Sequence, residues 1–325
     1  MCRHLAWLGV DRTLDELLLA RPSGLLQQSW APRQQRYGRV NADGFGVGWY
    51  APGSRPAPAR YRRAVPMWTD ASFASFAGVV ASGCVLAAVR DATVGMPIEE
   101  SSTAPFTHGP LLLSHNGRVS VDVLLGLLAG RPDAPAPDSR CDSALLAALV
   151  WERTLAGAGL AEAVAEVVTT VGEKASARAA SRAASRAAAD AGQQPASRLN
   201  LLVTDGRQVV ATTWNDTLWY RVTQAGVLVA SEPDDDAPTA PVPRQSRDDA
   251  VLAWPGPDGA ESGSEGHPAT EGHSATEGHS ATEGHSDSGT DVWVEVPNHR
   301  LLVADTRKVT VSNLISQDDY SGFTT

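Results

Sequence analysis

The second residue of the chain is a cysteine, and its position gives it chemistry that an internal cysteine lacks. Removal of Met1 would make Cys2 the N-terminal residue, with a thiol of reference pKa about 8.5 beside an α-amine of about 7.7 to 8.0. One residue would then hold a nucleophile and a base that is poised near neutral pH. Taken alone, Cys2 fits equally well as a small buried residue at the start of a strand.

Arg90 is the second residue whose place in the sequence suggests chemistry. It ends the apolar run Val85–Arg90 and is followed by Asp91-Ala92-Thr93-Val94-Gly95. A guanidinium at the end of a strand can hold a carboxylate through two parallel hydrogen bonds. The simpler interpretation is a surface arginine paired with Asp91.

A third motif, Asn116-Gly117, follows the apolar run that begins at Leu111. The dipeptide favours a tight turn. It could also direct the Asn116 side-chain amide and the Gly117 backbone N–H to one point, as an oxyanion hole requires.

Asp142 comes just before a helical pattern, in the stretch Ser139-Arg140-Cys141-Asp142-Ser143. Its most frequent role there is that of an N-cap. It could also be a buried carboxylate that receives a substrate ammonium, and the two roles are compatible.

The elements that must position these residues are mainly strands. Asn41–Tyr50 is a turn running into a glycine-rich strand, and its glycines allow close approach of a neighbouring backbone or a ligand. It is not a phosphate loop, because GxGxxG is absent and no Lys-Ser/Thr follows. Further strands are predicted by apolar runs or alternation between turn residues: Leu5–Val10, Phe45–Tyr50, Val85–Arg90, Leu111–His115, Leu199–Thr204, Val209–Trp214, Thr217–Arg221, Val227–Ser231, Val292–Val296, Arg300–Ala304 and Val309–Asn313.

Helices are expected where apolar residues recur at spacings of three and four. These segments are Thr13–Ala20, Val119–Ala129, Cys141–Thr154 and Leu160–Val171. Strand-rich halves with helices clustered between them predict α+β layers rather than an alternating parallel βαβ fold.

Two segments depart from globular composition. Gly172–Arg198 carries SRAA repeats without a large apolar residue, which predicts a solvated helical or disordered spacer. Pro233–Thr290 is rich in Gly, Ser, Glu and Pro and predicts a low-complexity insertion. Without the insertions at 172–198 and 233–290, 240 of the 325 residues remain, the size of a single domain.

The second insertion contains a six-residue repeat that places four histidines in register, namely His267, His273, His279 and His285. Weak binding of zinc, nickel or copper is one interpretation. A slipped-repeat linker is favoured, because structural metal sites use tighter spacings.

Composition excludes several classes of partner. The net charge of −10 argues against nucleic acid or anionic lipid. No stretch approaches the roughly 18 apolar residues of a membrane helix, and charges near the N-terminus are unlike a signal peptide, so we expect a cytoplasmic protein. Three scattered cysteines fit neither a disulfide framework nor a metal site.

Together and in this order, Cys2, the NADGFGVGWY strand, the Arg90 motif, His115-Asn-Gly117 and Cys141-Asp142 resemble the class II glutamine amidotransferases, which are N-terminal nucleophile hydrolases. The resemblance implies a four-layer αββα sandwich over one glutamine amidotransferase type 2 domain, residues 1–325 with the two insertions. Many family members have a histidine where this chain has Val94, so no role is assigned to that position.

The resemblance also implies the roles of the site residues. Cys2 would be the nucleophile and its α-amine the base, while Asn116 and Gly117 would form the oxyanion hole. Arg90 would hold the glutamyl α-carboxylate and Asp142 the glutamyl α-ammonium. The mechanism needs neither a metal nor an organic cofactor.

The stretches SHNGRV, CDSALLAAL, SEPDDD and WVEVPNHRLLV are most similar to the stand-alone branch of the family that serves ergothioneine biosynthesis. This implies hydrolysis of the γ-glutamyl amide bond of γ-glutamyl-hercynylcysteine S-oxide, a small-molecule substrate. The alternatives are a glutaminase or amidotransferase subunit, a hydrolase of another γ-glutamyl compound, or a metal-binding protein built around the histidine repeat. The sequence does not indicate an oligomeric state.

Overall fold

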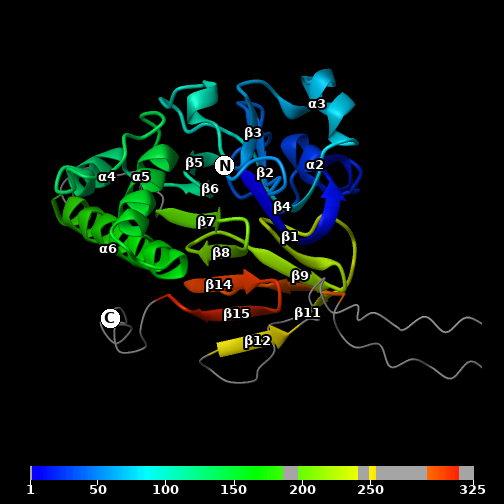
Figure 1. Ribbon diagram of the computed structural model, residues 1–325. Coiled ribbons are helices and arrows are strands. Elements are labelled where there is room, and N and C mark those ends of the chain that lie inside the picture. Colours follow the sequence, from blue (N-terminus) through cyan, green and yellow to red (C-terminus); the bar gives the residue numbers. More distant parts are fainter. Residues whose placement is uncertain (1, 186–196, 241–248, 254–290, 315–325) are drawn as a thin grey trace, which may run out of the picture.

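The computed structural model describes residues 2–185, 197–240, 249–253 and 291–314. Two β-sheets lie face to face, and helices cover the outer face of each (Figure 1). One apolar core fills the space between the sheets, and a further core lies under each helical layer. The fold is therefore the expected α+β sandwich with four layers in the order αββα.

The first sheet carries the start of the chain at its centre. Among the described residues it has eight strands, all antiparallel except the pair β11 and β13. In spatial order they are β11 (Thr239–Ala240), β13 (Trp293–Glu295), β9 (Trp219–Thr223), β10 (Gly226–Ala230), β1 (Arg3–Thr13), β4 (Ala81–Val89), β2 (Phe45–Trp49) and β3 (Ala59–Arg63).

The second sheet is antiparallel throughout and has seven strands within the described ranges. In spatial order they are β12 (Asp249–Ala253), β15 (Lys308–Asn313), β14 (Arg300–Asp305), β8 (Gln208–Thr213), β7 (Arg198–Thr204), β6 (Leu111–Arg118) and β5 (Phe106–His108).

Two groups of helices form the outer layers. The first sheet is covered by α1 (Leu14–Leu18), α2 (Leu25–Trp30) and α3 (Ala71–Ala77), and the second by α4 (Val121–Leu128), α5 (Asp142–Leu155) and α6 (Leu160–Ser185). Short 3-10 turns span Met67–Thr69 and Glu100–Ser102. In the part of the chain that the structure describes, no helix has both the length and the apolar character that crossing a membrane requires.

Strand alternation decides which side chains face the space between the sheets. In β1, Ala6 and Leu8 pack in the central core, whereas Leu5 and Trp7 pack under the helices. The same period of two directs Cys2 toward the central space. The chain thus enters the sandwich with its candidate nucleophile pointing between the sheets.

The sequence-based predictions are confirmed for every expected strand and helix, because each overlaps an observed element. Two local predictions are wrong. Asn116 and Gly117 do not form a turn but continue β6, paired with Asn200 and Leu199 of β7. The N-cap of α5 is Cys141, whose Sγ accepts a hydrogen bond from the Ala144 N–H at 3.4 Å, and Asp142 is the first helical residue.

Parts of the expected insertions belong to the folded body. Residues 172–185 continue α6, because Ala is a good helix former and this stretch has anchors that the composition did not suggest. Ala175 is buried, Gly172 lies against the Trp214 ring, and Arg178 pairs with Asp122 at 2.6 Å.

The acidic run at the start of the second insertion is also ordered. Asp234 is 3% exposed and pairs with Arg21 at 3.2 Å, and Asp235 pairs with Arg221 at 2.6 Å. These ion pairs hold the run against the first sheet, which explains why a charge-rich composition does not make it a linker.

Candidate active site

Cys2 lies where the ends of β1 and β4 meet. Because Arg3 is paired with Val89, the register brings Cys2 beside Arg90. Cys2 is a free, half-buried thiol that borders a small cavity. The residues around that cavity are Cys2, Ala88, Val89, Arg90, Ser102, Thr103, Ala104, Phe106, His115 and Ser143.

The electrostatics at Cys2 are mixed. Burial raises the pKa of its thiol, while a hydrogen bond from the Asp91 backbone and the charge of Arg90 lower it, and the charge of Asp142 raises it. Both Arg90 and Asp142 therefore act on the thiol. A base beside the sulfur would be needed to form the thiolate at neutral pH.

Arg90 is held by its backbone, which leaves its head group available. Its N–H donates to the Gly44 carbonyl at 2.8 Å, and its carbonyl accepts from the Asp43 N–H at 2.9 Å. The Asp43 carboxylate accepts from the Ala92 N–H at 2.8 Å and so braces the following segment. The Arg90 side chain is buried, and its Nη1 has no partner within the described residues.

The glycine-rich strand β2 and the turn before it lie against the Thr103–Ala104 segment, which borders the cavity. A side chain at Gly46 would collide with the Ala104 carbonyl oxygen, and one at Gly44, whose φ is +143°, would meet Thr103. The expected close approach thus brings in a neighbouring backbone, the Thr103–Ala104 segment that borders the cavity of Cys2.

Asn116 and Gly117 lie at the end of β6, on either face of the strand. Asn116 is fully buried and faces the central space, where its Nδ2 donates to the Ser231 Oγ at 3.4 Å, while its Oδ1 has no partner among the described residues. Gly117 is a place of close approach, since a Cβ there would collide with the Arg198 carbonyl oxygen.

Asp142 is 7% exposed at the N-terminus of α5. Its Oδ2 accepts from the Val119 N–H at 3.0 Å and its Oδ1 from the Ser143 N–H at 2.9 Å. The helix N-terminus favours a carboxylate at this place. Oδ2 keeps a lone pair with which to accept a further hydrogen bond.

The structure adds His115, which we did not predict as a site residue. It borders the cavity of Cys2, with its Nδ1 3.0 Å from the Ser143 Oγ and its Nε2 3.0 Å from the Arg198 carbonyl. A carbonyl only accepts, so Nε2 carries the hydrogen. Burial lowers the pKa of the imidazole although the charge of Asp142 raises it, and the neutral ring then accepts from Ser143. The alternation of side chains along β6 would have predicted from the sequence that His115 lies on the face toward α5.

Two of the predicted residues border the same cavity, and the other three lie next to it in the chain. Cys2 and Arg90 border one cavity, together with His115 and Ser143. Asn116 is next to His115 in the chain, and Asp142 is next to Ser143. All five predicted positions therefore lie at one end of the two sheets.

No group of three or more metal-ligating side chains occurs in the residues that the structure describes. The four histidines of the repeat, His267, His273, His279 and His285, lie outside the described residues.

Comparison with known proteins identifies relatives along most of the chain. No family model matches. A protein from Mycolicibacterium smegmatis called gamma-glutamyl-hercynylcysteine sulfoxide hydrolase is 44% identical over 239 residues, which are 73% of this chain and 90% of the relative. A protein of the same name from Mycobacterium tuberculosis (strain CDC 1551 / Oshkosh) is 45% identical over 244 residues, 75% of this chain and 90% of the relative.

Solved structures share the fold. A glutamine aminotransferase class-II domain protein from Silicibacter pomeroyi has a TM-score of 0.54 at 18% identity and covers 97% of this chain and 100% of its own. Glutamine phosphoribosylpyrophosphate amidotransferase from B. subtilis has a TM-score of 0.53 at 11% identity, with 98% of this chain and 50% of its own covered.

Proposed function

Because the chain belongs to the family of the gamma-glutamyl-hercynylcysteine sulfoxide hydrolases, we propose that it hydrolyses the γ-glutamyl amide bond of gamma-glutamyl-hercynylcysteine sulfoxide in ergothioneine biosynthesis. The products are glutamate and hercynylcysteine sulfoxide. The observation that carries the proposal is the identity of 44% and 45% to two such hydrolases across 90% of their length.

Cys2 is the nucleophile of the proposed mechanism, after removal of Met1. Its α-amine takes the thiol proton, and the thiolate adds to the γ-carbonyl carbon of the substrate. The free thiol at the edge of a small cavity supports this role. Burial raises the pKa of the thiol, so an adjacent amine that accepts the proton is the chemical requirement that an N-terminal cysteine meets.

Asn116 and Gly117 stabilise the tetrahedral oxyanion in this mechanism. Ser231 already accepts the His4 N–H at 3.0 Å, and its own hydroxyl hydrogen needs an acceptor. If the Asn116 amide is turned by 180°, which exchanges the positions of Oδ1 and Nδ2, Oδ1 accepts that hydrogen and the amino group is free for the oxyanion. This arrangement also satisfies an oxygen that is otherwise buried without a partner.

Arg90 and Asp142 bind the glutamyl half. The unpartnered Nη1 of Arg90 supports binding of the α-carboxylate, because a planar guanidinium makes paired hydrogen bonds to carboxylates. Asp142 is buried and held by two backbone N–H groups, so it presents a fixed negative charge to the α-ammonium.

The reaction then proceeds in two halves. Collapse of the tetrahedral intermediate breaks the C–N bond, the amine leaves with the proton held by the Cys2 ammonium, and a γ-glutamyl thioester remains. The freed α-amine takes a proton from water as the hydroxyl attacks the thioester, and glutamate and the thiol are released. Each group of Cys2 ends in the state in which it began.

We place the enzyme in a reducing compartment, the cytoplasm, because all three of its cysteines are free in the structure and the mechanism needs a free thiol. One catalytic domain carries the reaction, and we assign the repeat around Glu265–His285 to an insertion that takes no part in it.

The test is to supply the enzyme, in parallel, with gamma-glutamyl-hercynylcysteine sulfoxide, γ-glutamylcysteine and L-glutamine, and to measure glutamate release. A kcat/KM highest for the sulfoxide is the expected result. Preference for glutamine would identify a glutaminase instead. Asn116→Ala should lower kcat by about 100-fold or more, and a kcat equal to that of the wild type would contradict the oxyanion assignment.

A further inference from the structure

Two arginines face each other at the end of the second sheet. Arg118 of β6 is paired directly with Arg198 of β7. Side chains at such positions lie on the same face of an antiparallel pair, with Cβ atoms roughly 5 Å apart, and like charges there repel. An anion placed between the two guanidinium groups would relieve this repulsion.

The anions of the protein offset it only in part. Arg198 is 6% exposed, and its one ion pair among the described residues is with Asp216, 3.7 Å from its Nε. That Nε makes no hydrogen bond within the described part of the chain. The Tyr37 ring lies 4.6 Å from the guanidinium carbon. Burial lowers the pKa of Arg198, and the charges of Asp216 and Arg118 act on it in opposite directions.

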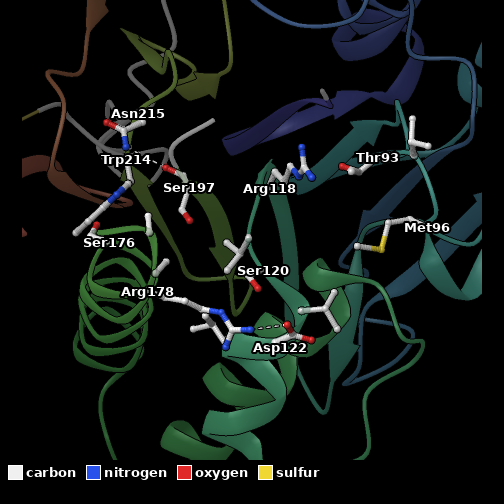
Figure 2. Close-up of a pocket in the computed structure, with 16 residues that line it drawn as sticks. Thr93, Met96, Arg118, Ser120, Asp122, Ser176, Arg178, Ser197, Trp214 and Asn215 are labelled. Atoms are coloured by element: carbon white, nitrogen blue, oxygen red, sulfur yellow. Dashed lines mark hydrogen bonds and ion pairs between the residues drawn. The ribbon is translucent and has the colours of Figure 1, made fainter. Parts of the chain in front are cut away.

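Arg118 is exposed, and none of the ion pairs between described residues includes it. It borders a cavity of about 530 Å³, a volume in the range of roughly 300 to 1,000 Å³ typical of small-molecule sites. Figure 2 shows Arg118 and Thr93 on one side of this cavity and the ion pair of Arg178 with Asp122 on another. Since Arg178 is neutralised, Arg118 is the cation in the wall that lacks a protein partner.

The cavity adjoins the candidate active site. Thr93 follows Arg90 by three residues, and Arg118 directly follows Gly117. Val119, which also borders the cavity, donates its N–H to Asp142. The cavity is thus connected to the candidate active site by neighbouring residues of the chain and by this hydrogen bond.

We propose that Arg118, with Arg198 behind it, binds the carboxylate of the departing amine and so selects γ-glutamyl amides of α-amino acids. The inference rests on the proposed function, because the amine that the proposed hydrolysis releases is the α-amine of a substituted cysteine. Its carboxylate is two bonds from the scissile nitrogen. Gly117 is assigned to the oxyanion, and the Cα of Arg118 lies about 3.8 Å further along the chain, so the proposed carboxylate and Arg118 are close neighbours.

The experiment compares γ-glutamylcysteine with γ-glutamylcysteamine, which has the same amide but lacks the carboxylate of the departing amine. Arg118→Gln should lower kcat/KM for γ-glutamylcysteine on the order of tenfold or more, mainly through KM. For γ-glutamylcysteamine kcat/KM should stay unchanged. Arg207→Gln, at an exposed turn beyond β7, is the matched control and should alter neither substrate.

Binding provides a second measurement that needs no turnover. In Cys2→Ala protein, calorimetry should show tighter binding of γ-glutamylcysteine than of γ-glutamylcysteamine, and Arg118→Gln should abolish the difference. Equal losses for both ligands would place Arg118 on the glutamyl half, and no loss for either would remove it from the site; both results overturn the inference. Cleavage of γ-glutamylcysteine without cleavage of the sulfoxide would instead reject the proposed function alone.

Discussion

Cys2, Cys84 and Cys141 are all free thiols, and their surroundings differ. Cys84 is buried beside the Thr204 hydroxyl at 3.3 Å, and burial raises its pKa to about 12. Cys141 is buried as the N-cap of α5, and burial raises its pKa as well. Only Cys2 is both at a cavity and next to an arginine with an unpartnered nitrogen.

The Asn116 and Gly117 pair shows what a local motif can and cannot reveal. The residue types suggested an oxyanion hole, but the turn expected from the dipeptide is absent. Gly117 is needed for a contact that is distant in sequence, the approach of the Arg198 carbonyl. The Asn-Gly dipeptide alone does not predict such a contact, because the partner residue is far away in the sequence.

Substitution of Gly117 tests this contact. Gly117→Ala should lower kcat by about 100-fold or more, because the new methyl group collides with the β7 backbone and displaces an oxyanion donor. Steady-state kinetics with a thermal unfolding curve on the same sample measure both effects. Gly126→Ala, on the exposed side of α4 with open space around it, is the control and should keep full activity. Wild-type kcat in Gly117→Ala would reject the assigned role.

At the scale of elements, strongly patterned segments were predictable and weakly patterned ones were not. The buried strands β1, β4, β6, β7 and β8 carry apolar runs or alternation that depend only on local sequence. Strand β3 reads ARYRR, and its pairing with β2 at the sheet edge determines its conformation. Strands β5 and β11 and the helices α2 and α3 are too short to establish a period.

Contacts with distant residues also explain why two segments are ordered although their composition predicted spacers or linkers. Helix α6 continues through residues 172–185 because Arg178 and Ala175 find tertiary partners. The acidic run begins with Asp234, which is matched by Arg21, a residue far away in sequence. The amino-acid composition of a segment does not show which residues elsewhere in the chain contact it.

The glycine-rich strand β2 gives a prediction at this scale. Gly46→Ala should weaken substrate binding and raise KM, because the added methyl group collides with the Ala104 carbonyl and moves a wall of the Cys2 cavity. Gly53→Ala, in the turn after β2 where a Cβ meets nothing within 4 Å, is the control. An unchanged KM in Gly46→Ala would mean that this wall does not shape the site.

At the scale of the whole molecule, the four-layer sandwich brings residues from distant parts of the chain to one end of the sheets. The two sheets could be predicted as α+β layers from strand and helix patterns. Their stacking and the seating of Arg118 beside Arg198 could not, because strand order is set by pairing between segments far apart in sequence.

Buried histidines predict how stability depends on pH. Burial lowers the pKa of His4 well below 6.5 and also lowers that of His115. Below pH about 6.5 the unfolded chain therefore takes up protons that the folded chain does not, and the free energy of unfolding decreases as the pH is lowered. The slope is on the order of 1 kcal/mol per pH unit for a histidine that stays neutral in the folded chain. Asp234 acts in the opposite direction, since burial raises its pKa to about 6 and the folded chain protonates it first.

Denaturant unfolding at about pH 7.5, 6.5 and 5.5, which span the titration of an unperturbed histidine, measures the net effect of the histidines and Asp234 on stability. Stability should decrease toward pH 5.5, and Asp234→Asn should make the decrease steeper by removing the opposing group. Stability that holds or rises toward pH 5.5 would contradict the neutral state of the buried histidines.

Deletion of Glu265–His285 tests whether the catalytic domain hydrolyses the substrate without the histidine repeat. The residues of the site and of the three cores lie elsewhere in the chain. The deleted protein should keep the kcat/KM and the thermal midpoint of the full chain. Loss of hydrolysis would assign the repeat a part in catalysis.

The measurement that tests the central claim most directly is mass spectrometry of the enzyme after reaction with a γ-glutamyl chloromethyl ketone. This electrophile places a reactive carbon where the scissile amide would lie. The account predicts a chain that lacks Met1 and carries one label, on Cys2, with Cys84 and Cys141 unmodified. A label on another residue, or an active and labelled chain that retains Met1, would contradict the N-terminal nucleophile.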